Sequence, residues 1–406
     1  MARMSPERQL ELLSQTAVDV ERPEELLDKL RRRRPLRVKA GFDPSAPNIH
    51  LGHSIPMDVL KLFQDLGHTV VFIVGDFTAR IGDPSGKLKS RPMLSEQAVE
   101  RNAQTYFEQV GRILDVSKAE VRRNSEWLEK LDFAGVLRLT GSYTVARMLE
   151  RDTFAQRMAA DEPITITEML YPLAQGYDSV AIDADVEIGG TDQLFNLLVA
   201  RDVQRFYSQE PEVIMTFPLL VGLDGVEKMS SSLGNTVALT DPPGDMYGKL
   251  MSINDQAMLD YYRLLLRPPE IEIEDMRQRI EAREVNPRDI KARLAFQIAA
   301  RYHGKPAAQR AQDEFDQVFA QGKLPSEMPE VSLGPQDLAK GGILLTRLIT
   351  KAGLAASSSE ARRLVEQGAV RLDDERLTDA RAAVNPKSGA VLRVGRRRFA
   401  RIVRRN

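Results

Sequence analysis

Two histidines at the start of an expected helix are the first residues in this chain whose types and spacing could do chemistry. His50 and His53 flank Leu51 and Gly52 just after a proline-rich turn. Free N–H groups at a helix start attract phosphate oxygens, and side chains three apart share one helix face, where both could donate to developing charge. Gly52 has no Cβ atom, so a flat ring could lie against the backbone. The alternative is that both histidines only cap or pack the helix.

A lysine followed by three serines forms a second segment of this kind, about 175 residues further along the chain. Lys228, Met229 and the serines at 230–232 lie between Gly222 and Gly234, so a flexible loop is expected. A mobile lysine suits a triphosphate, because the loop can close for a reaction and open again to release pyrophosphate. Taken alone, such a segment is most often an ordinary surface turn.

Together, in this order and at this distance, the two segments resemble the ATP-handling motifs of class I aminoacyl-tRNA synthetases. The resemblance implies catalytic roles for His50, His53, Lys228 and Ser231, and ATP binding by these residues together with Gly52 and Met229. Ser231 stands where the family usually carries a second lysine, although some members have serine there. One cation aimed at the pyrophosphate is therefore missing from the loop.

A basic, turn-rich loop at 81–91 offers a replacement for that cation. It resembles the loop that supplies phosphate contacts in tyrosyl enzymes, where Lys87 and Arg91 match the positive residues. Our hypothesis is that Lys87, Arg91 and Lys228 together hold the pyrophosphate. The alternative for this loop is a solvated surface turn.

Four further segments narrow the resemblance to bacterial tyrosyl-tRNA synthetases: 41–44, 82–85, 170–178 and 189–193. The resemblance implies that Asp192 binds the ribose hydroxyls of ATP, and that Gln193 contacts the ribose or the substrate carboxylate. Many bacterial members have a tyrosine, which contacts the substrate hydroxyl, where this chain has Lys39. The chain is therefore similar to the other bacterial subtype.

The substrate helix of this family corresponds to 170–178, and its polar residues have helical spacing. Tyr171, Gln175 and Asp178 lie at i, i+4 and i+7, on one helix face. A buried Asp178 could accept the proton of a phenol hydroxyl, while Tyr171 and Gln175, with Asp83, could hold the substrate ammonium. Such a site rejects phenylalanine, because its polar group would be left unpaired. The alternative is an ordinary helix face, and the sequence names no second partner for the hydroxyl.

The elements that must position these residues form an α/β pattern. A strand at 36–41, a helix at 52–66 and a buried strand at 70–76 make a βαβ unit, which predicts a parallel, Rossmann-like sheet with helices on both faces. Further strands are expected at 179–182 and 213–217. A helix is expected at 5–34, and a helical insertion at about 95–160.

Three domains are expected along the chain. Residues 1–240 form the catalytic domain with the lysine loop at 226–236, and 241–325 form an α-helical domain, taken by position as anticodon-binding. Proline and glycine mark a linker at 326–340. Residues 341–406 resemble a small α+β S4-type RNA-binding domain.

The terminal segment is also basic. From Lys340 to Asn406 there are 16 Lys and Arg against 6 Asp and Glu, a net charge of +10 in a chain of net charge −1. This asymmetry suits a polyanionic partner. The resemblance implies that Arg347, Arg362 and Arg363 face RNA phosphates, with contacts set by shape and charge. The alternative is a basic tail kept for solubility.

Composition excludes several other classes of protein. The 406 residues contain no cysteine, which excludes disulfides and thiolate catalysis, and the four histidines form no obvious metal cluster. No signal peptide or apolar run of membrane-spanning length is visible, so we expect a cytoplasmic protein without a structural metal.

These observations predict ATP-dependent tyrosylation of tRNA(Tyr) through tyrosyl-adenylate, with L-tyrosine and ATP as substrates and Mg²⁺ accompanying ATP. The family implies a homodimer with an interface near 115–160. The alternatives are a tryptophanyl enzyme, a non-catalytic RNA-binding regulator favoured by Ser231, and a small-molecule nucleotidyltransferase, which leaves the basic tail unexplained.

Overall fold

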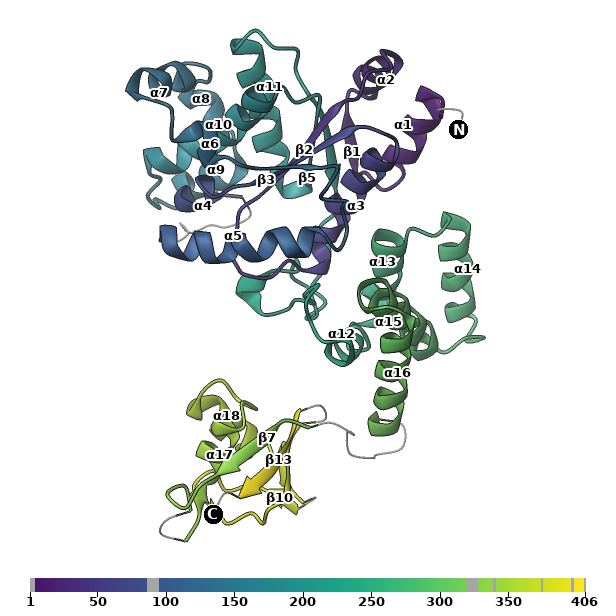
Figure 1. Cartoon of the computed structure of the whole chain (residues 1–406), viewed down its shortest axis with the longest axis vertical. Helices are drawn as coiled ribbons and strands as arrows, with labels where there is room; N and C mark the ends of the chain where they lie inside the picture. Colours follow the sequence, from purple (N-terminus) through teal and green to yellow (C-terminus); the bar gives the residue numbers. More distant parts are fainter. Residues whose placement is uncertain are drawn as a thin grey trace. The chain divides into compact units, whose positions relative to one another are not determined.

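The computed structural model describes residues 4–85, 95–319, 328–338, 341–373, 375–395 and 398–404. They form two compact units, Met1–Gln312 and Asp313–Asn406 (Figure 1).

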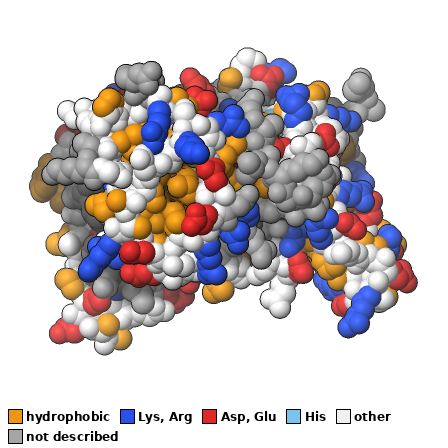
Figure 2. Space-filling model, turned by 90° about the horizontal axis from the view of Figure 1, so that it is seen from below, with side chains coloured by type: hydrophobic (Ala, Val, Ile, Leu, Met, Phe, Trp, Pro, Cys, Tyr) orange, Lys and Arg blue, Asp and Glu red, His pale blue; other side chains and the backbone are white. Residues whose placement is uncertain are grey.

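Lys and Arg side chains alternate with Asp and Glu over the face drawn in Figure 2, with hydrophobic side chains gathered between them. This face therefore carries charges of both signs rather than a single-sign field.

The first unit is built on a six-stranded sheet of order β1-β6-β5-β2-β3-β4. Its strands are β1 (Asp19–Glu21), β2 (Arg37–Phe42), β3 (Thr69–Val74), β4 (Glu120–Arg123), β5 (Val186–Gly190) and β6 (Val213–Phe217). All neighbours pair in parallel except β1, which runs antiparallel to β6. The predicted Rossmann-like parallel sheet is confirmed.

The strand order reverses between β2 and β5. From β2 the chain builds outward through β3 to β4, then returns to start β5 on the other side of β2. Right-handed crossovers consequently put α3 (Leu51–Asp65) and α11 (Leu194–Phe206) on opposite faces of the sheet (Figure 1). The carboxyl ends of β2 and β5 diverge at this switch point, which is where open α/β sheets bind ligands.

The buried strands follow directly from the sequence. In β3 the residues from Val70 to Val74 are at most 1% exposed, as expected for a parallel strand covered on both faces. The predicted elements at 36–41, 52–66, 70–76 and 213–217 agree with β2, α3, β3 and β6 to within two residues at each end.

The other helices of the first unit lie before, between and after these strands. They are α1 (Pro6–Ser14), α2 (Pro23–Arg31), α4 (Thr78–Ile81), α5 (Glu96–Val110), α6 (Ser125–Leu128), α7 (Phe133–Thr140), α8 (Val145–Met148), α9 (Asp152–Ala159), α10 (Ile166–Ile182), η1 (Thr191–Gln193) and η2 (Ser231–Leu233). The helical part beyond residue 241 contains α12 (Pro243–Leu250), α13 (Asp255–Tyr261), η3 (Tyr262–Leu266), α14 (Glu270–Glu281), α15 (Pro287–His303) and α16 (Lys305–Phe319).

Three sequence predictions about these elements are wrong. The helix at 5–34 is broken by β1, because 19–21 pair with β6 as the edge strand of the sheet and Arg22 adopts a left-handed conformation with φ 59°. The strand at 179–182 is instead the last turn of α10, since a short apolar run fits a buried helix as well as a strand. The segment 95–160 is not wholly helical, because it also supplies β4.

The second unit contains a five-stranded sheet of order β10-β9-β12-β13-β7 and a two-stranded sheet of β11 and β8. Its elements are β7 (Glu330–Leu333), β8 (Ile343–Leu344), α17 (Leu345–Lys351), α18 (Ser358–Glu366), β9 (Val370–Leu372), β10 (Glu375–Leu377), β11 (Ala383–Val384), β12 (Val391–Val394) and β13 (Arg398–Arg404). β7 pairs in parallel with β13, so the predicted linker at 326–340 contains a strand of this sheet.

Candidate active site

A cavity of about 540 Å³ opens at the switch point of the sheet. Its lining includes the predicted residues His50, Gly52, His53, Asp83, Tyr171, Gln175, Asp178, Asp192, Gln193, Lys228, Met229 and Ser231. Residues widely separated in sequence thus meet at the carboxyl ends of β2 and β5. The predicted phosphate ligands Lys87 and Arg91 lie outside the described residues.

The two histidines stand at the start of α3 as a neutral pair. His50 is the N-cap residue and His53 lies in the first turn, with their rings stacked at 3.7 Å between centroids. Burial lowers the pKa of His50 to about 2, aided by the charges of His53 and Lys228. Burial and the charge of Lys228 lower the pKa of His53 to about 4. At neutral pH both rings can donate hydrogen bonds to phosphate without carrying charge.

The lysine loop reaches across the cavity to the turn that follows β5. Lys228 Nζ lies 2.5 Å from Asp192 Oδ2. The loop is fixed by Asn235, whose Oδ1 accepts from Ser230 N at 2.8 Å and whose Nδ2 donates to the Lys228 carbonyl at 3.1 Å. Ser231 is exposed at the start of η2. A nucleotide that uses both Lys228 and Asp192 must therefore separate their ion pair.

The polar face of α10 lines the cavity. Tyr171 Oη donates to Asp43 Oδ2 at 2.9 Å, and Gln175 Nε2 donates to Glu187 Oε1 at 3.1 Å. Asp178, which is 3% exposed, accepts from Trp127 Nε1 at 2.8 Å and from Asn124 Nδ2 at 3.3 Å.

The environment of Asp178 sets its protonation. Burial raises the pKa of Asp178 to about 7, against the opposing effects of Lys39 and of the Trp127 and Asn124 hydrogen bonds. The carboxylate is consequently poised between its charged and neutral forms near neutral pH.

Asp83 is held in the cavity lining by Gln193 of η1 and by Arg151, the residue before α9. Its Oδ2 accepts from Gln193 Nε2 at 2.9 Å, and its Oδ1 lies 3.7 Å from Arg151 Nη2. Arg151 is itself anchored to Asn196 Oδ1 at 3.0 Å. This buried arginine compensates the charge of Asp83 and fixes the direction of its carboxylate.

Several of these contacts come from residues that the sequence did not assign to the site. Asp43 stands in the segment 41–44, which was noticed without a role for that side chain. Asn124 and Trp127 follow β4, a strand hidden in a segment predicted to be helical. Arg151 and Glu187 gave no local signal, because their partners are distant in sequence.

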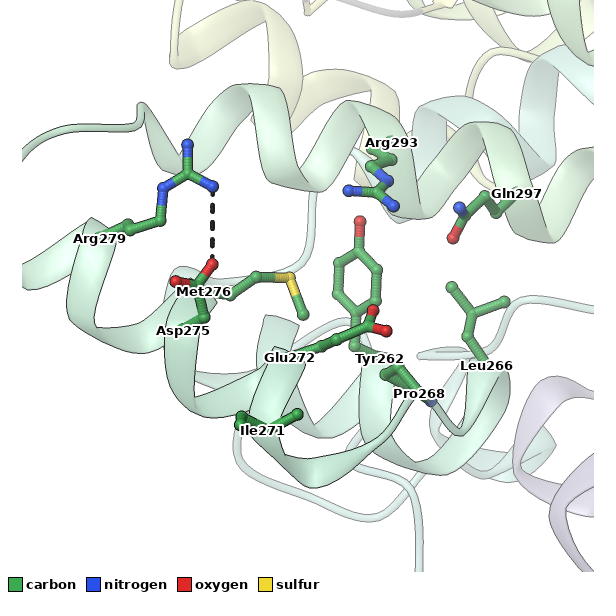
Figure 3. A pocket seen from close by; sticks show the side chains of 10 residues that line it. All are labelled: Tyr262, Leu266, Pro268, Ile271, Glu272, Asp275, Met276, Arg279, Arg293 and Gln297. Atoms are coloured by element: carbon green, nitrogen blue, oxygen red, sulfur yellow. Dashed lines mark ion pairs between the residues drawn. The ribbon is translucent and has the colours of Figure 1, made fainter.

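A second cavity of about 510 Å³ lies in the helical part, between η3, α14 and α15 (Figure 3). Tyr262 projects across it toward Arg293, and Arg279 pairs with Asp275 at 3.6 Å. It contains none of the predicted site residues.

The predicted RNA-facing arginines lie on the two helices of the second unit. Arg347 is on α17 with its side chain 70% exposed, and Arg362 and Arg363 are exposed on α18. Within the described ranges, no three or more His, Asp or Glu side chains are grouped so as to hold a metal ion. No helix in the described part of the chain is long and apolar enough to cross a membrane.

Comparison with known proteins agrees with this arrangement. The family described as tRNA synthetases class I (W and Y) matches residues 31–320, and the S4 domain family matches 345–388. The chain is 51% identical to the tyrosine–tRNA ligase of Thermotoga maritima, over 98% of each chain. It is 50% identical to that of Moorella thermoacetica, over 97% of this chain and 95% of the relative.

A solved structure supports the fold alone. The tyrosyl-tRNA synthetase of Archaeoglobus fulgidus, complexed with L-tyrosine, superposes with a TM-score of 0.62 at 22% identity, over 76% of this chain and 99% of the other.

The switch-point cavity, the paired motifs and the family match define a class I aminoacyl-tRNA synthetase with a C-terminal S4 domain. Within that class, the chain belongs to the tyrosine–tRNA ligase family. The predicted family, fold class and enzyme class are confirmed, and these relatives do not support the tryptophanyl, regulatory or nucleotidyltransferase alternatives.

Proposed function

We propose that the chain joins L-tyrosine to tRNA(Tyr) in two steps within the switch-point cavity. A carboxylate oxygen of tyrosine attacks the α-phosphorus of ATP, and pyrophosphate leaves. A ribose hydroxyl at the 3′ end of the tRNA then attacks the tyrosyl carbonyl carbon, and AMP leaves. The observation that carries the proposal is that every described residue predicted for tyrosine or ATP binding lines this one cavity. Neither step needs a covalent enzyme intermediate, so positioning and charge stabilisation dominate.

Tyrosine is bound by its two polar ends. Asp178 accepts the hydrogen bond of the phenol hydroxyl at the closed end of the cavity, where Trp127 and Asn124 orient it. Tyr171, Gln175 and Asp83 hold the ammonium group. Phenylalanine is rejected because it leaves the buried Asp178 without its partner.

ATP lies across the start of α3. His50 and His53 donate to its phosphates, the adenine lies against Gly52, and Asp192 and Gln193 hold the ribose. Lys228 leaves Asp192 when the nucleotide enters and, with Met229 and Ser231 in the same loop, covers the triphosphate. Lys87 and Arg91 supply the further positive charge that Ser231 does not. Mg²⁺ enters with ATP as the counter-ion of its phosphate oxygens.

The tRNA is bound by the remaining parts of the chain. The exposed arginines of α17 and α18 contact its phosphates, which suits the +10 charge of the terminal segment. The α-helical domain at 241–325 binds the anticodon. The catalytic domain at 1–240 and the S4-like domain at 341–406, whose sheet also takes in β7, complete the proposed organisation.

The enzyme works as a homodimer in the cytoplasm. Large apolar side chains are exposed along α7, α8, α9 and the start of α10: Phe133, Leu137, Val145, Met158 and Ile166, between 55% and 78% exposed. Several large apolar side chains exposed along consecutive helices are the kind of surface that protein–protein interfaces cover. They support the interface expected near 115–160.

ATP–pyrophosphate exchange tests the proposal. Exchange should depend on tyrosine and be absent with tryptophan or without an amino acid. Exchange that required tryptophan, or none with any of the three, would contradict the proposed reaction.

A further inference from the structure

A charged cluster lies behind the tyrosine end of the cavity, where the mechanism above uses none of its members. Lys39 of β2 is 1% exposed, and its Nζ lies 3.0 Å from Glu187 Oε1 of β5 and 3.2 Å from the carbonyl oxygen of Gln175. Glu187 is also 1% exposed. The two residues come from the neighbouring strands at the switch point, so the cluster forms part of the cavity wall.

The cluster holds Gln175 at two points. The side-chain amide of Gln175 donates to the same Glu187 Oε1 at 3.1 Å, while its main-chain carbonyl accepts from Lys39. The Lys39–Glu187 pair therefore fixes both the position of α10 at Gln175 and the direction of the amide that faces the cavity.

Lys39 is the positive charge that faces the buried carboxyl groups at this end of the cavity. Lys39 faces Glu187, Asp178 and the wholly buried Glu212, which accepts from Ser179 Oγ at 3.0 Å. Burial and the charge of Glu187 raise the pKa of Glu212 well above its usual value. Burial lowers the pKa of Lys39, but the acidic groups around it more than offset this effect and raise the pKa above its usual value, so Lys39 is charged. Lys39 and Glu187 thus form a neutral pair beside Asp178.

We propose that Lys39 and Glu187 are positioning residues of the tyrosine site, and that their buried ion pair positions the side chains of Gln175 and Asp178 for binding the substrate. Lys39 acts through these residues, because it is 1% exposed and does not line the cavity itself. This inference rests on the proposed tyrosine activation.

Stability alone is a poor reason for this arrangement. Two buried charges lose their hydration, and apolar residues of similar volume often serve folding as well or better. An ion pair that shares an acceptor with the substrate-facing amide of Gln175 has a positional role that apolar residues could not supply.

The first test is the Michaelis constant for tyrosine in ATP–pyrophosphate exchange. Lys39→Met should raise this KM by about 10- to 150-fold, the range for losing a hydrogen bond of a charged group. The KM for ATP should change by less than about threefold, because the lost contacts lie at the tyrosine end.

Lys291 provides a matched control. It is buried in the helical part and, like Lys39, contacts a carboxylate and a main-chain carbonyl: Asp255 Oδ1 at 2.6 Å and the Ile253 oxygen at 2.7 Å. Lys291→Met should leave the KM for tyrosine unchanged. Equal effects of the two variants on both Michaelis constants would show a purely structural role for Lys39 and overturn the proposal.

The second test is the sign of a pH shift. Lys39 and Glu187 are the charged groups that act on Asp178, lowering and raising its pKa respectively. Because ionised Asp178 accepts the hydroxyl, kcat/KM for tyrosine should fall on the acid side as Asp178 is protonated. Lys39→Met should move this acid limb to higher pH, and Glu187→Gln should move it to lower pH.

Opposite shifts support the proposal, whereas shifts in one direction, or none, overturn it. If Lys39→Met does not fold, the direction in which Glu187→Gln shifts the acid limb of kcat/KM decides between these outcomes. If wild-type exchange does not require tyrosine, the proposed function fails first. If wild-type exchange requires tyrosine but the variants have the same Michaelis constants as the Lys291 control, only this inference fails.

Discussion

Trp127 offers a sharp test of how the tyrosine hydroxyl is read. Its indole Nε1 donates to Asp178 Oδ1 at 2.8 Å, and its ring packs against a cluster that includes Val71 and Ile73. Trp127→Phe keeps an aromatic ring in the cluster and removes the N–H donor. The change therefore isolates one hydrogen bond to the carboxylate proposed to read the substrate.

The expected magnitude follows from the burial of Asp178. A hydrogen bond to a charged group contributes about 1.5–3 kcal/mol, which corresponds to about 10- to 150-fold in kcat/KM for tyrosine. The same bond lowers the pKa of Asp178, which is about 7 in the intact site. Its loss should raise this pKa and move the acid limb of kcat/KM upward by about one pH unit.

ATP–pyrophosphate exchange across pH 5.5–9 (about the range the enzyme should tolerate) measures both effects. Tyr262→Phe is a matched control, because it removes a 3.0 Å hydrogen bond to the Ile290 carbonyl outside the site. Trp127 is also the single tryptophan, so its emission should report tyrosine binding directly in the wild type and in the control. A Trp127→Phe enzyme with unchanged kcat/KM and an unmoved acid limb would refute the proposed role of Asp178.

Three further predictions concern the phosphates, the tRNA and the dimer. Lys87→Ala and Arg91→Ala should each slow adenylate formation by about 100-fold in single-turnover experiments, the usual cost of losing one charge-stabilising group; unchanged rates would remove them from the pyrophosphate site. Deletion of 341–406 should reduce tRNA charging far more than tyrosine-dependent exchange, and equal losses would contradict an RNA role for that segment. Phe133→Asp should shift the sedimentation of the enzyme from dimer toward monomer, because it places a charge in the exposed apolar surface of α7. A dimer that sediments unchanged would show that this surface is not the dimer interface.

The polar set on α10 was predictable because it depends on local geometry. The helical period alone puts Tyr171, Gln175 and Asp178 on one face, and the structure brings that face to the cavity. The motif around His50 was predictable from its resemblance to the ATP-handling motifs of class I aminoacyl-tRNA synthetases and from the proline-rich turn before the helix.

The groups that tune those residues were not predictable. Lys39 and Glu187 form an ion pair between neighbouring strands. Asn124 and Trp127 follow β4 in the chain and donate hydrogen bonds to Asp178. Such partners depend on strand order, which periodicity does not encode. The neutral state of His50 likewise depends on burial that exists only in the folded chain.

The central claim is that Asp178 selects tyrosine by its hydroxyl. The most direct test is the ratio of kcat/KM for tyrosine to kcat/KM for phenylalanine, measured by ATP–pyrophosphate exchange in the wild type and in Asp178→Ala. The account predicts that the ratio collapses, because tyrosine loses its buried acceptor while phenylalanine loses nothing. An equal loss of activity with both amino acids, leaving the ratio unchanged, would contradict it.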